Sequence, residues 1–322
     1  MKRFAILATA IVLVVVAWSG AWLYAAGEIR RTIDAQAAAD GISSPRLTCG
    51  TLEVAGFPFR FDVTCLEASA QIEDMTVDLA EWRATVLVYR PTHLLAFGRG
   101  PARITDAFTG SSSELSWEEL EASVRLSGWR IARASLTADT IAWSDTLVGQ
   151  SLIGSASHLE AHLIDMPDAH EPERGVSALA AYVRLEDVSA PGFDVAGGEA
   201  TLEAELTGIP DDVRAFGDPD LLPRWQQAGG ALNLVGFRAQ AGEQFFQSTG
   251  SLQLSDAGLA NGRFDVESRG ILEEIGDMLP PDMRQLILGN PDADGTYSQS
   301  IGLTNGVIFS GMLPIGMIPA LF

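Results

Sequence analysis

Lysine is almost absent from this chain, because Lys2 is the only lysine among 322 residues. Schiff-base catalysis and phosphate binding by a P-loop lysine both need a primary amine. No lysine follows position 2, so the sequence excludes both chemistries for the rest of the chain.

Positive charge of any kind is scarce. Lysine and arginine number 21 against 42 aspartates and glutamates, which gives a formal net charge of −21 at pH 7. A surface of this sign repels nucleic-acid phosphates and the headgroups of anionic lipids. We therefore expect no nucleic-acid partner and no docking to a membrane through a basic face.

Motifs of common catalytic centres are missing as well. The chain holds no G-x-S-x-G turn, no H-E-x-x-H pair and no complete dinucleotide-binding glycine pattern. His158, Glu160 and His162 would share the solvent face of a strand, where a metal could bridge them. We favour an ordinary solvated polar face for these three residues.

The segment 290–301 begins like a calcium-binding loop. Asn290, Asp292 and Asp294 occupy its first, third and fifth places, and Gly295 its sixth. The twelfth place requires a bidentate glutamate, whereas this chain has Ile301 there. We interpret the segment as a turn.

We expect no catalytic, cofactor-binding or metal-binding residues, and we expect the protein not to be an enzyme.

Cysteine occurs only twice, as Cys49 and Cys65. Gly56-Phe57-Pro58 has the composition of a turn midway between them, with alternating apolar residues on either side. A hairpin turning at Phe57 would place the cysteines opposite each other, within reach of a disulfide bond. A reactive thiol pair and a zinc site are the alternatives, but C-x-x-C spacing and further zinc ligands are lacking. We predict a structural disulfide between Cys49 and Cys65.

Residues 4–24 carry no charge and follow Lys2 and Arg3. A helix of this length spans about 30 Å, the hydrocarbon thickness of a bilayer. A cleaved signal peptide is the alternative, but its apolar region would be shorter. Trp18 and Trp22 also lie where interfacial aromatic residues gather. We predict a retained single-pass anchor in the inner membrane, with a cytoplasmic N-terminus and a periplasmic C-terminal domain.

Most of the remaining chain predicts β-structure. Short runs of alternating apolar residues, separated by Gly, Ser, Asp and Pro, are typical of antiparallel strands with one buried face. Helices are expected at 211–227 and 271–288, with a short helical turn at 116–122. The fold class is thus mainly β. We expect a long curved antiparallel sheet or a two-layer, groove-like architecture with a few short helices, after one N-terminal transmembrane helix.

The predicted organisation has three parts. Residues 1–26 form the transmembrane anchor, residues 27–45 a helical stalk, and residues 46–322 a periplasmic β-rich domain that could be subdivided near 210–230.

The last segment, 308–322, is uncharged and broken by Pro314 and Pro319. It is either a strand with a tail packed into the core, which we favour, or an exposed apolar patch for a lipid or a partner.

Two segments carry a family resemblance: GFPFR at residues 56–60 and GMLPIG at residues 311–316. The chain resembles, over nearly its whole length, an uncharacterised family of membrane-anchored envelope proteins of Gram-negative bacteria, known as a domain of unknown function. The hairpin pattern and the anchor are more distantly similar to the AsmA-like proteins. This resemblance implies a groove-forming sheet that faces the periplasm and a part in lipid handling or outer-membrane biogenesis.

These observations lead to one functional hypothesis and two alternatives. The hypothesis is a non-enzymatic periplasmic protein that holds lipid or a hydrophobic partner on a concave sheet face. One alternative is an envelope assembly or scaffold factor that binds another protein through a sheet edge and the C-terminal tail. The other is a hydrolase with dispersed catalytic residues.

Overall fold

The computed structural model of the chain describes residues 2–42, 44–270 and 289–322. Its strands form one long antiparallel sheet of 16 strands, which confirms the predicted mainly β fold. Two α-helices accompany the sheet in the described part of the chain. The helix expected at 271–288 lies outside the described residues.

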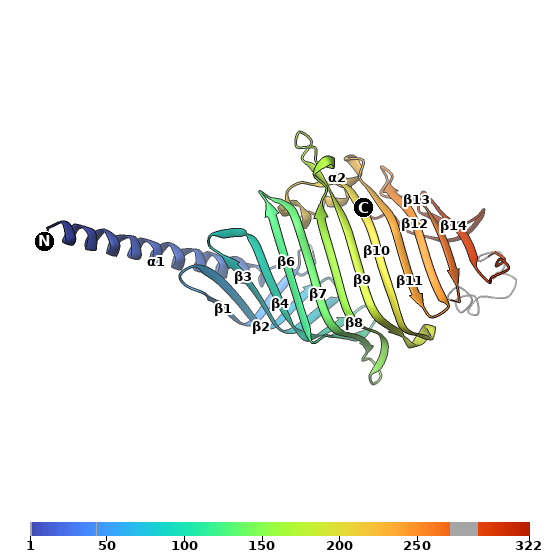
Figure 1. Cartoon of the computed structure of the whole chain (residues 1–322), viewed down its shortest axis with the longest axis horizontal. Coiled ribbons are helices and arrows are strands. Elements are labelled where there is room, and N and C mark those ends of the chain that lie inside the picture. Colours follow the sequence, from blue (N-terminus) through green and yellow to red (C-terminus); the bar gives the residue numbers. More distant parts are fainter. Residues whose placement is uncertain (1, 43, 271–288) are drawn as a thin grey trace. The chain divides into compact units, whose positions relative to one another are not determined.

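Helix α1 (Lys2–Gln36) contains the whole apolar N-terminal run and continues without a break beyond Glu28 (Figure 1). Its most apolar 18-residue window has a mean hydropathy of 2.4. It is the one helix in the described ranges that is long and apolar enough to cross a membrane. Trp22 and Ala26 are its buried residues.

The chain divides into two compact units, Met1–Ser123 with Asp145–Gln150, and Val124–Ser144 with Ser151–Phe322. The strands of the first unit are neighbours in chain order. They are β1 (Arg46–Ala55), β2 (Arg60–Ile72), β3 (Met75–Leu87), β4 (Arg90–Asp106) and β5 (Ser112–Ser116). Strand β6 (Glu119–Ser127) includes residues of both units.

Strand β6 corrects the expected helical turn at 116–122. Glu119 and Glu121 alternate there with Leu120 and Ala122. This two-residue period suits a strand, whose successive side chains point to opposite faces. The two glutamates occupy one side of that strand.

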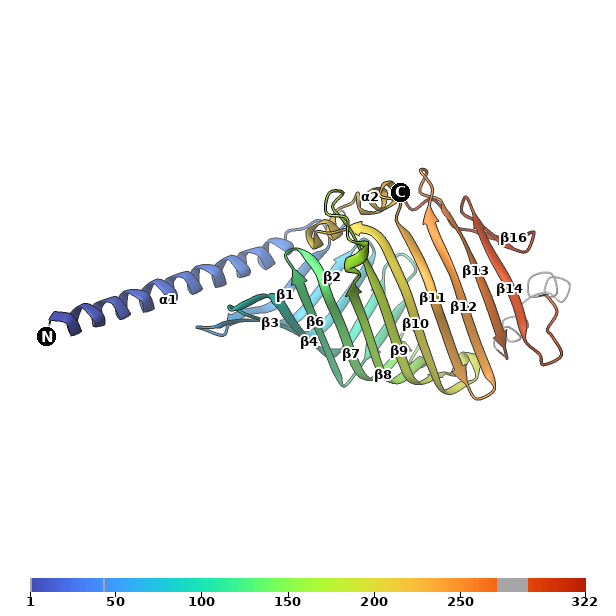
Figure 2. The ribbon, with the colours of Figure 1, turned by 45° about the horizontal axis from the view of Figure 1, so that its top comes forward.

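The second unit continues as a series of antiparallel strands that also lie side by side in chain order (Figure 2). Tight turns join many of them, as at Gly242, whose φ of +57° suits glycine. The strands are β7 (Arg130–Asp145), β8 (Ser151–Asp165), β9 (Val176–Ala190), β10 (Val195–Pro210), β11 (Ala231–Ala241), β12 (Gln244–Leu254), β13 (Ala260–Arg269), β14 (Tyr297–Thr304), β15 (Val307–Ser310) and β16 (Leu313–Met317).

A hydrophobic core occupies one end of the second unit. Helix α2 (Leu221–Gln227) places Trp225 there, and the indole N–H donates to the carbonyl of Thr207 at 2.7 Å. The predicted region 211–227 is therefore helical in part, as a 3-10 turn (Val213–Gly217) followed by α2. The buried core residues are Leu179, Ile209, Trp225, Leu254, Ala260 and Leu303.

The C-terminal segment is packed only in part, because Met312 and Met317 are 97% and 74% exposed. Ile318 packs against the core, and its N–H donates to the carbonyl of Gly306 at 2.7 Å. Pro314 lies within β16, the last strand in the order of the sheet. An edge strand tolerates proline because one side of its backbone needs no partner.

Candidate functional site

The two faces of the sheet differ sharply in the first unit. Residues that lie opposite each other on antiparallel strands share a face, so the register shows which side chains gather together. On β2, β3 and β4 one face is apolar up to Asp106, which lies opposite Met75 at its end, and we call it the first apolar face. Its members are Phe61, Val63, Cys65, Ala68, Ala70, Ile72, Met75, Val77, Leu79, Trp82, Ala84, Val86, Leu94, Ala96, Gly98, Ala102 and Ile104.

The reverse of the same strands is polar. Glu81 lies opposite Arg99 there, and their side chains approach to 3.5 Å. Asp62 accepts a hydrogen bond from Thr85 at 2.9 Å. This side of the first unit therefore suits contact with water, and the first apolar face is a distinct surface.

The second unit repeats the division. The register of β8 to β14 again brings uncharged side chains together, and we call this surface the second apolar face. Its members include Leu159, Ala161, Leu163, Ala181, Val183, Leu185, Ala200, Leu202, Ala204, Leu234, Phe237, Ala239, Phe246, Gly250, Phe264, Val266 and Ile301. The intervening residues, such as Arg184, Glu203 and Asp265, are polar.

Most side chains of both apolar faces are only partly covered by other residues. Among the described residues, the largest side chains less than 2% exposed are those of Cys65, Ser177 and Ser268. Leu94 and Leu163, on the two apolar faces, remain 36% and 37% exposed. The chain exposes 19336 Å², whereas a compact protein of 34.3 kDa would expose about 12,900 Å². The exposed helix α1 supplies part of this excess.

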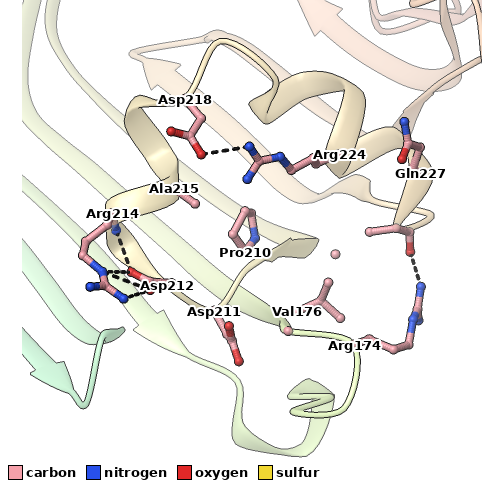
Figure 3. A pocket seen from close by; sticks show the side chains of 13 residues that line it. Arg174, Val176, Pro210, Asp211, Asp212, Arg214, Ala215, Asp218, Arg224 and Gln227 are labelled. Atoms are coloured by element: carbon pink, nitrogen blue, oxygen red, sulfur yellow. Dashed lines mark hydrogen bonds and ion pairs between the residues drawn. The ribbon is translucent and has the colours of Figure 1, made fainter.

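A cavity of about 900 Å³ lies at the end of the second unit (Figure 3). Three arginines line it, and each already has an acidic or carbonyl partner. Arg224 lies 2.9 Å from Asp218, and Arg174 donates to the carbonyl of Ala228 at 2.9 Å. Arg214 pairs with Asp212.

The Arg214–Asp212 pair shifts the pKa values of both of its side chains. The Arg214 side chain and backbone N–H donate to Asp212 and lower the pKa of that carboxyl from 3.8 to about 2. The same pairing raises the pKa of Arg214. The Arg214 guanidinium also lies 4.3 Å from the centre of the Trp129 ring. These contacts hold the 3-10 turn in place, and they leave no arginine of the cavity without a partner.

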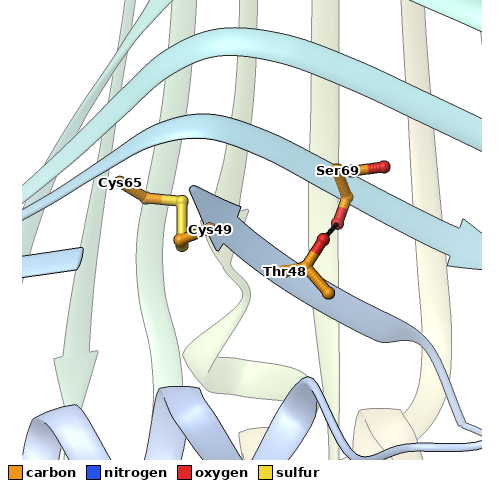
Figure 4. The surroundings of a disulfide bond; sticks show 4 residues. All are labelled: Thr48, Cys49, Cys65 and Ser69. Atoms are coloured by element: carbon orange, nitrogen blue, oxygen red, sulfur yellow. Dashed lines mark hydrogen bonds between the residues drawn. A yellow bond between two sulfur atoms is a disulfide. The ribbon is translucent and has the colours of Figure 1, made fainter. Parts of the chain in front are cut away.

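The predicted disulfide is present, with a Cα–Cα distance of 5.4 Å (Figure 4). The expected pairing across the hairpin was wrong, however, because Cys49 lies opposite Ala68 and Cys65 opposite Leu52. Glu67 interrupts the ladder between them with a φ of +51° and has no partner in the register. This irregularity turns the diagonal cysteines toward each other.

His158, Glu160 and His162 share one face of β8, as expected for a strand. It is the polar side, where the imidazole of His162 pairs with the hydroxyl of Ser135 at 2.9 Å. Over the described ranges, no group of three or more His, Cys, Asp or Glu side chains is arranged to hold a metal.

The calcium-like segment forms a turn before β14. The carboxylate of Asp292 accepts the backbone N–H groups of Asp294 at 2.9 Å and Thr296 at 2.8 Å. The aspartate therefore serves the loop's own backbone, which agrees with the interpretation as a turn.

Sequence reasoning did not find the contact between α1 and the tip of the β1–β2 hairpin. Trp18 and Trp22 donate their indole N–H groups to carbonyls of that tip, about 40 residues away. The available signals were the aromatic residues of both segments, which the sequence alone could not bring together.

One family model, described as "Uncharacterized protein conserved in bacteria (DUF2125)", matches residues 22–319. This match bears out the resemblance to an uncharacterised bacterial family, while the AsmA-like resemblance and the envelope location stay predictions. No curated protein and no solved structure matches the chain.

Proposed function

Since the chain belongs to the DUF2125 family of uncharacterized bacterial proteins, we propose its function from its geometry. It is a membrane-anchored periplasmic protein, not an enzyme, that holds lipid acyl chains on its two apolar faces. The inner membrane holds α1, with the N-terminus in the cytoplasm.

One observation carries this proposal. Each unit presents a broad apolar face whose leucines and phenylalanines stay partly accessible, with charged residues only at its end, backed by a polar face. Covering apolar surface is worth about 0.8 kcal/mol for each buried CH₂ group of a ligand. An acyl chain lying on such a face would gain this energy, while its headgroup could remain in water.

A comparison of two neighbouring cross-strand pairs tests the proposal. Leu202 lies opposite Phe237 on the second apolar face, and Thr201 lies opposite Arg238 on the polar side. We expect Leu202→Gln with Phe237→Gln to lower the lipid that copurifies with the full chain at least fivefold. Thr201→Gln with Arg238→Gln should leave it unchanged. Native mass spectrometry and lipid extraction provide the measurement.

The contrary results are equally clear. A wild-type chain that carries no lipid in native mass spectra would refute the proposal. So would equal lipid content in both double variants and the wild type. Circular dichroism of the three proteins must show the same β-signal, so that a loss of lipid is not mistaken for a loss of fold.

The proposed location has its own test. Protease added to spheroplasts should degrade a C-terminal tag, and the mature protein should keep the mass of residues 1–26. Protection of the tag in intact spheroplasts, with digestion only after lysis, would place the β-rich part in the cytoplasm. That result would contradict this part of the proposal.

A further inference from the structure

The tip of the β1–β2 hairpin is fastened to α1 by two hydrogen bonds. The indole N–H of Trp18 donates to the carbonyl of Pro58 at 3.1 Å, and that of Trp22 donates to the carbonyl of Arg60 at 3.0 Å. Both donors belong to the long apolar helix. The hairpin tip therefore lies alongside the segment that is suited to cross the membrane.

Aromatic contacts reinforce this attachment. Trp22 stacks on Phe61 with ring centres 5.3 Å apart and meets Phe57 edge-on at 5.5 Å. Trp18 lies 6.4 Å from the ring of Phe59. The tip thus has a defined height along α1, between Trp18 and Trp22.

That height corresponds to a position inside a bilayer. Twenty residues counted from Phe4 cover the hydrocarbon thickness and end at Leu23, so Trp22 lies near its boundary. Trp18 lies five residues deeper than Leu23, which is about 8 Å at the rise of an α-helix. Pro58 and Phe59, beside Trp18, would be at a similar depth in the periplasmic leaflet.

The chemistry of the tip fits that depth. Residues 55–59 carry no charge, and Phe57 and Phe59 are 52% and 62% exposed. The first charged residue is Arg60, whose guanidinium is 2.7 Å from Asp62. Arg60 lies at the level of Trp22, from which a long side chain can reach the headgroups.

The backbone of the tip is also prepared for an apolar medium, in which an unpaired carbonyl costs several kcal/mol. The carbonyl of Gly56 accepts from the N–H of Arg60 at 3.1 Å, and that of Phe59 accepts from the N–H of Val88 at 2.9 Å. The carbonyls of Pro58 and Arg60 accept from the two indoles of α1. In water these last two bonds would add little, because solvent could replace the indoles.

A cavity of about 470 Å³ lies between the helix and the tip. No charged side chain lines it; its walls are Val14, Val15, Trp18, Ser19 and the segment Phe57-Pro58-Phe59. Phe61, where the first apolar face begins, stacks on Trp22, four residues after Trp18 on the helix.

We propose that residues 56–59 are a membrane-inserted wedge, and that its cavity receives an acyl chain of a phospholipid in the periplasmic leaflet. The wedge brings that chain next to Phe61, the start of the first apolar face. The inference rests on the membrane anchoring of the proposed function and extends it with a point of lipid entry.

Depth-dependent fluorescence quenching tests the wedge. The disulfide leaves no free cysteine in the chain, so single cysteines introduced by substitution can be labelled with the fluorophore NBD. The full chain is reconstituted in phosphatidylcholine–phosphatidylglycerol vesicles. Phe59→Cys and Phe57→Cys probe the tip, Leu13→Cys probes the anchor, and Val148→Cys is an exposed control in the first unit, 92% accessible.

Lipids with a nitroxide on the acyl chain should quench NBD at both tip positions at least threefold more strongly than NBD at position 148. Aqueous iodide should show the reverse order. Two tip positions are used so that misfolding of one variant does not decide the result. The probe at position 13 should be quenched by the nitroxide lipids as well.

Other results overturn the inference in distinguishable ways. If both tip probes respond to iodide as the probe at 148 does, while position 13 is quenched by nitroxide lipids, the tip lies in water and the anchor stands. If position 13 also escapes the nitroxide, anchoring and wedge both fail. Lipid on the second apolar face is measured separately by native mass spectrometry.

Discussion

Arg130 and Asp165 form an ion pair with a nitrogen–oxygen distance of 3.0 Å at the end of the second apolar face. Asp165 is the last residue of β8 and continues the alternation of Leu159, Ala161 and Leu163. Its side chain is 8% exposed, and that of Arg130 is 20% exposed. His170 contacts Arg130 and lies 3.2 Å from Asp211, so the pair belongs to a short charged network.

Removing one partner of this pair should lower the unfolding free energy more than replacing both partners by apolar residues. Asp165→Ala leaves the Arg130 guanidinium half-buried without its carboxylate, and we expect a loss of about 3–5 kcal/mol in unfolding free energy. The double variant Arg130→Met with Asp165→Leu should lose much less, because no charge remains to be desolvated. Urea unfolding in detergent provides the measurement.

The matched control is the exposed pair of Arg263 and Asp265, whose side chains are 71% and 65% accessible. Asp265→Ala should change the unfolding free energy by less than about 1 kcal/mol, as usual for surface ion pairs. Equal losses for Asp165→Ala and Asp265→Ala would contradict the assigned role of the buried pair.

The disulfide between Cys49 and Cys65 should stabilise the first unit. The two cysteines are separated by 16 positions, and closing a loop of this length restricts the unfolded chain by about 3 kcal/mol. We expect Cys49→Ser with Cys65→Ser to unfold at lower urea concentration. Dithiothreitol should destabilise the wild type to the same extent and leave the double variant unaffected; no response of the wild type would show that the bond does not stabilise it.

The strands could be predicted from the sequence because alternation is a local signal. The runs around Val77 and Val183 lie in strands, as their alternation predicts. The strand register depends on irregularities that leave no pattern in the sequence. The β1–β2 hairpin turns between Ala55 and Asp62 and not around Phe57, so Cys65 lies opposite Leu52 and not opposite Cys49.

The sequence predicted the type of site, an apolar sheet face, but not its extent or its contact with α1. An apolar sheet face follows from alternation, but its extent depends on which strands become neighbours. The contact between Trp18 and Pro58 spans 40 positions. Their composition indicated a membrane boundary and a turn separately, and only the fold shows that the two segments meet.

Asp212 predicts a dependence of stability on pH. Its folded pKa of about 2 lies below the ordinary 3.8, because Arg214 donates to its carboxylate. The ionised form therefore stabilises the fold fully above about pH 4, and this contribution is lost as the pH falls toward 2. The carboxylate is exposed, so the effect should be modest and should shrink in high salt.

Asp212→Asn isolates this contribution. At pH 6 the wild type should resist urea better than the variant, and the two unfolding curves should converge as the pH approaches 2. A carboxyl titration followed by NMR should place the midpoint of Asp212 well below that of the unfolded chain. A constant difference between the two proteins from pH 6 to pH 2 would rule out the Arg214 pairing as its cause.

The core of the second unit depends on a close approach between Trp225 and Gly230. The indole ring lies directly over Gly230, where an added Cβ would overlap it. Gly230→Ala should therefore lower the unfolding free energy by about 1–3 kcal/mol, as overpacking does in a filled core. Gly217→Ala is the control, since no atom lies within 4 Å of its added Cβ, and its effect should stay within about 0.5 kcal/mol.

A double-mutant cycle identifies the cause of this loss. Trp225→Ala alone should cost about 3–5 kcal/mol, because it removes a buried indole and its hydrogen bond to Thr207. In that background the overlap no longer exists, so Gly230→Ala should add almost nothing. The contrary result is an equal loss of unfolding free energy for Gly230→Ala with and without the indole. The backbone would then require the glycine, and the packing of Trp225 on Gly230 would not be what positions α2 over the sheet.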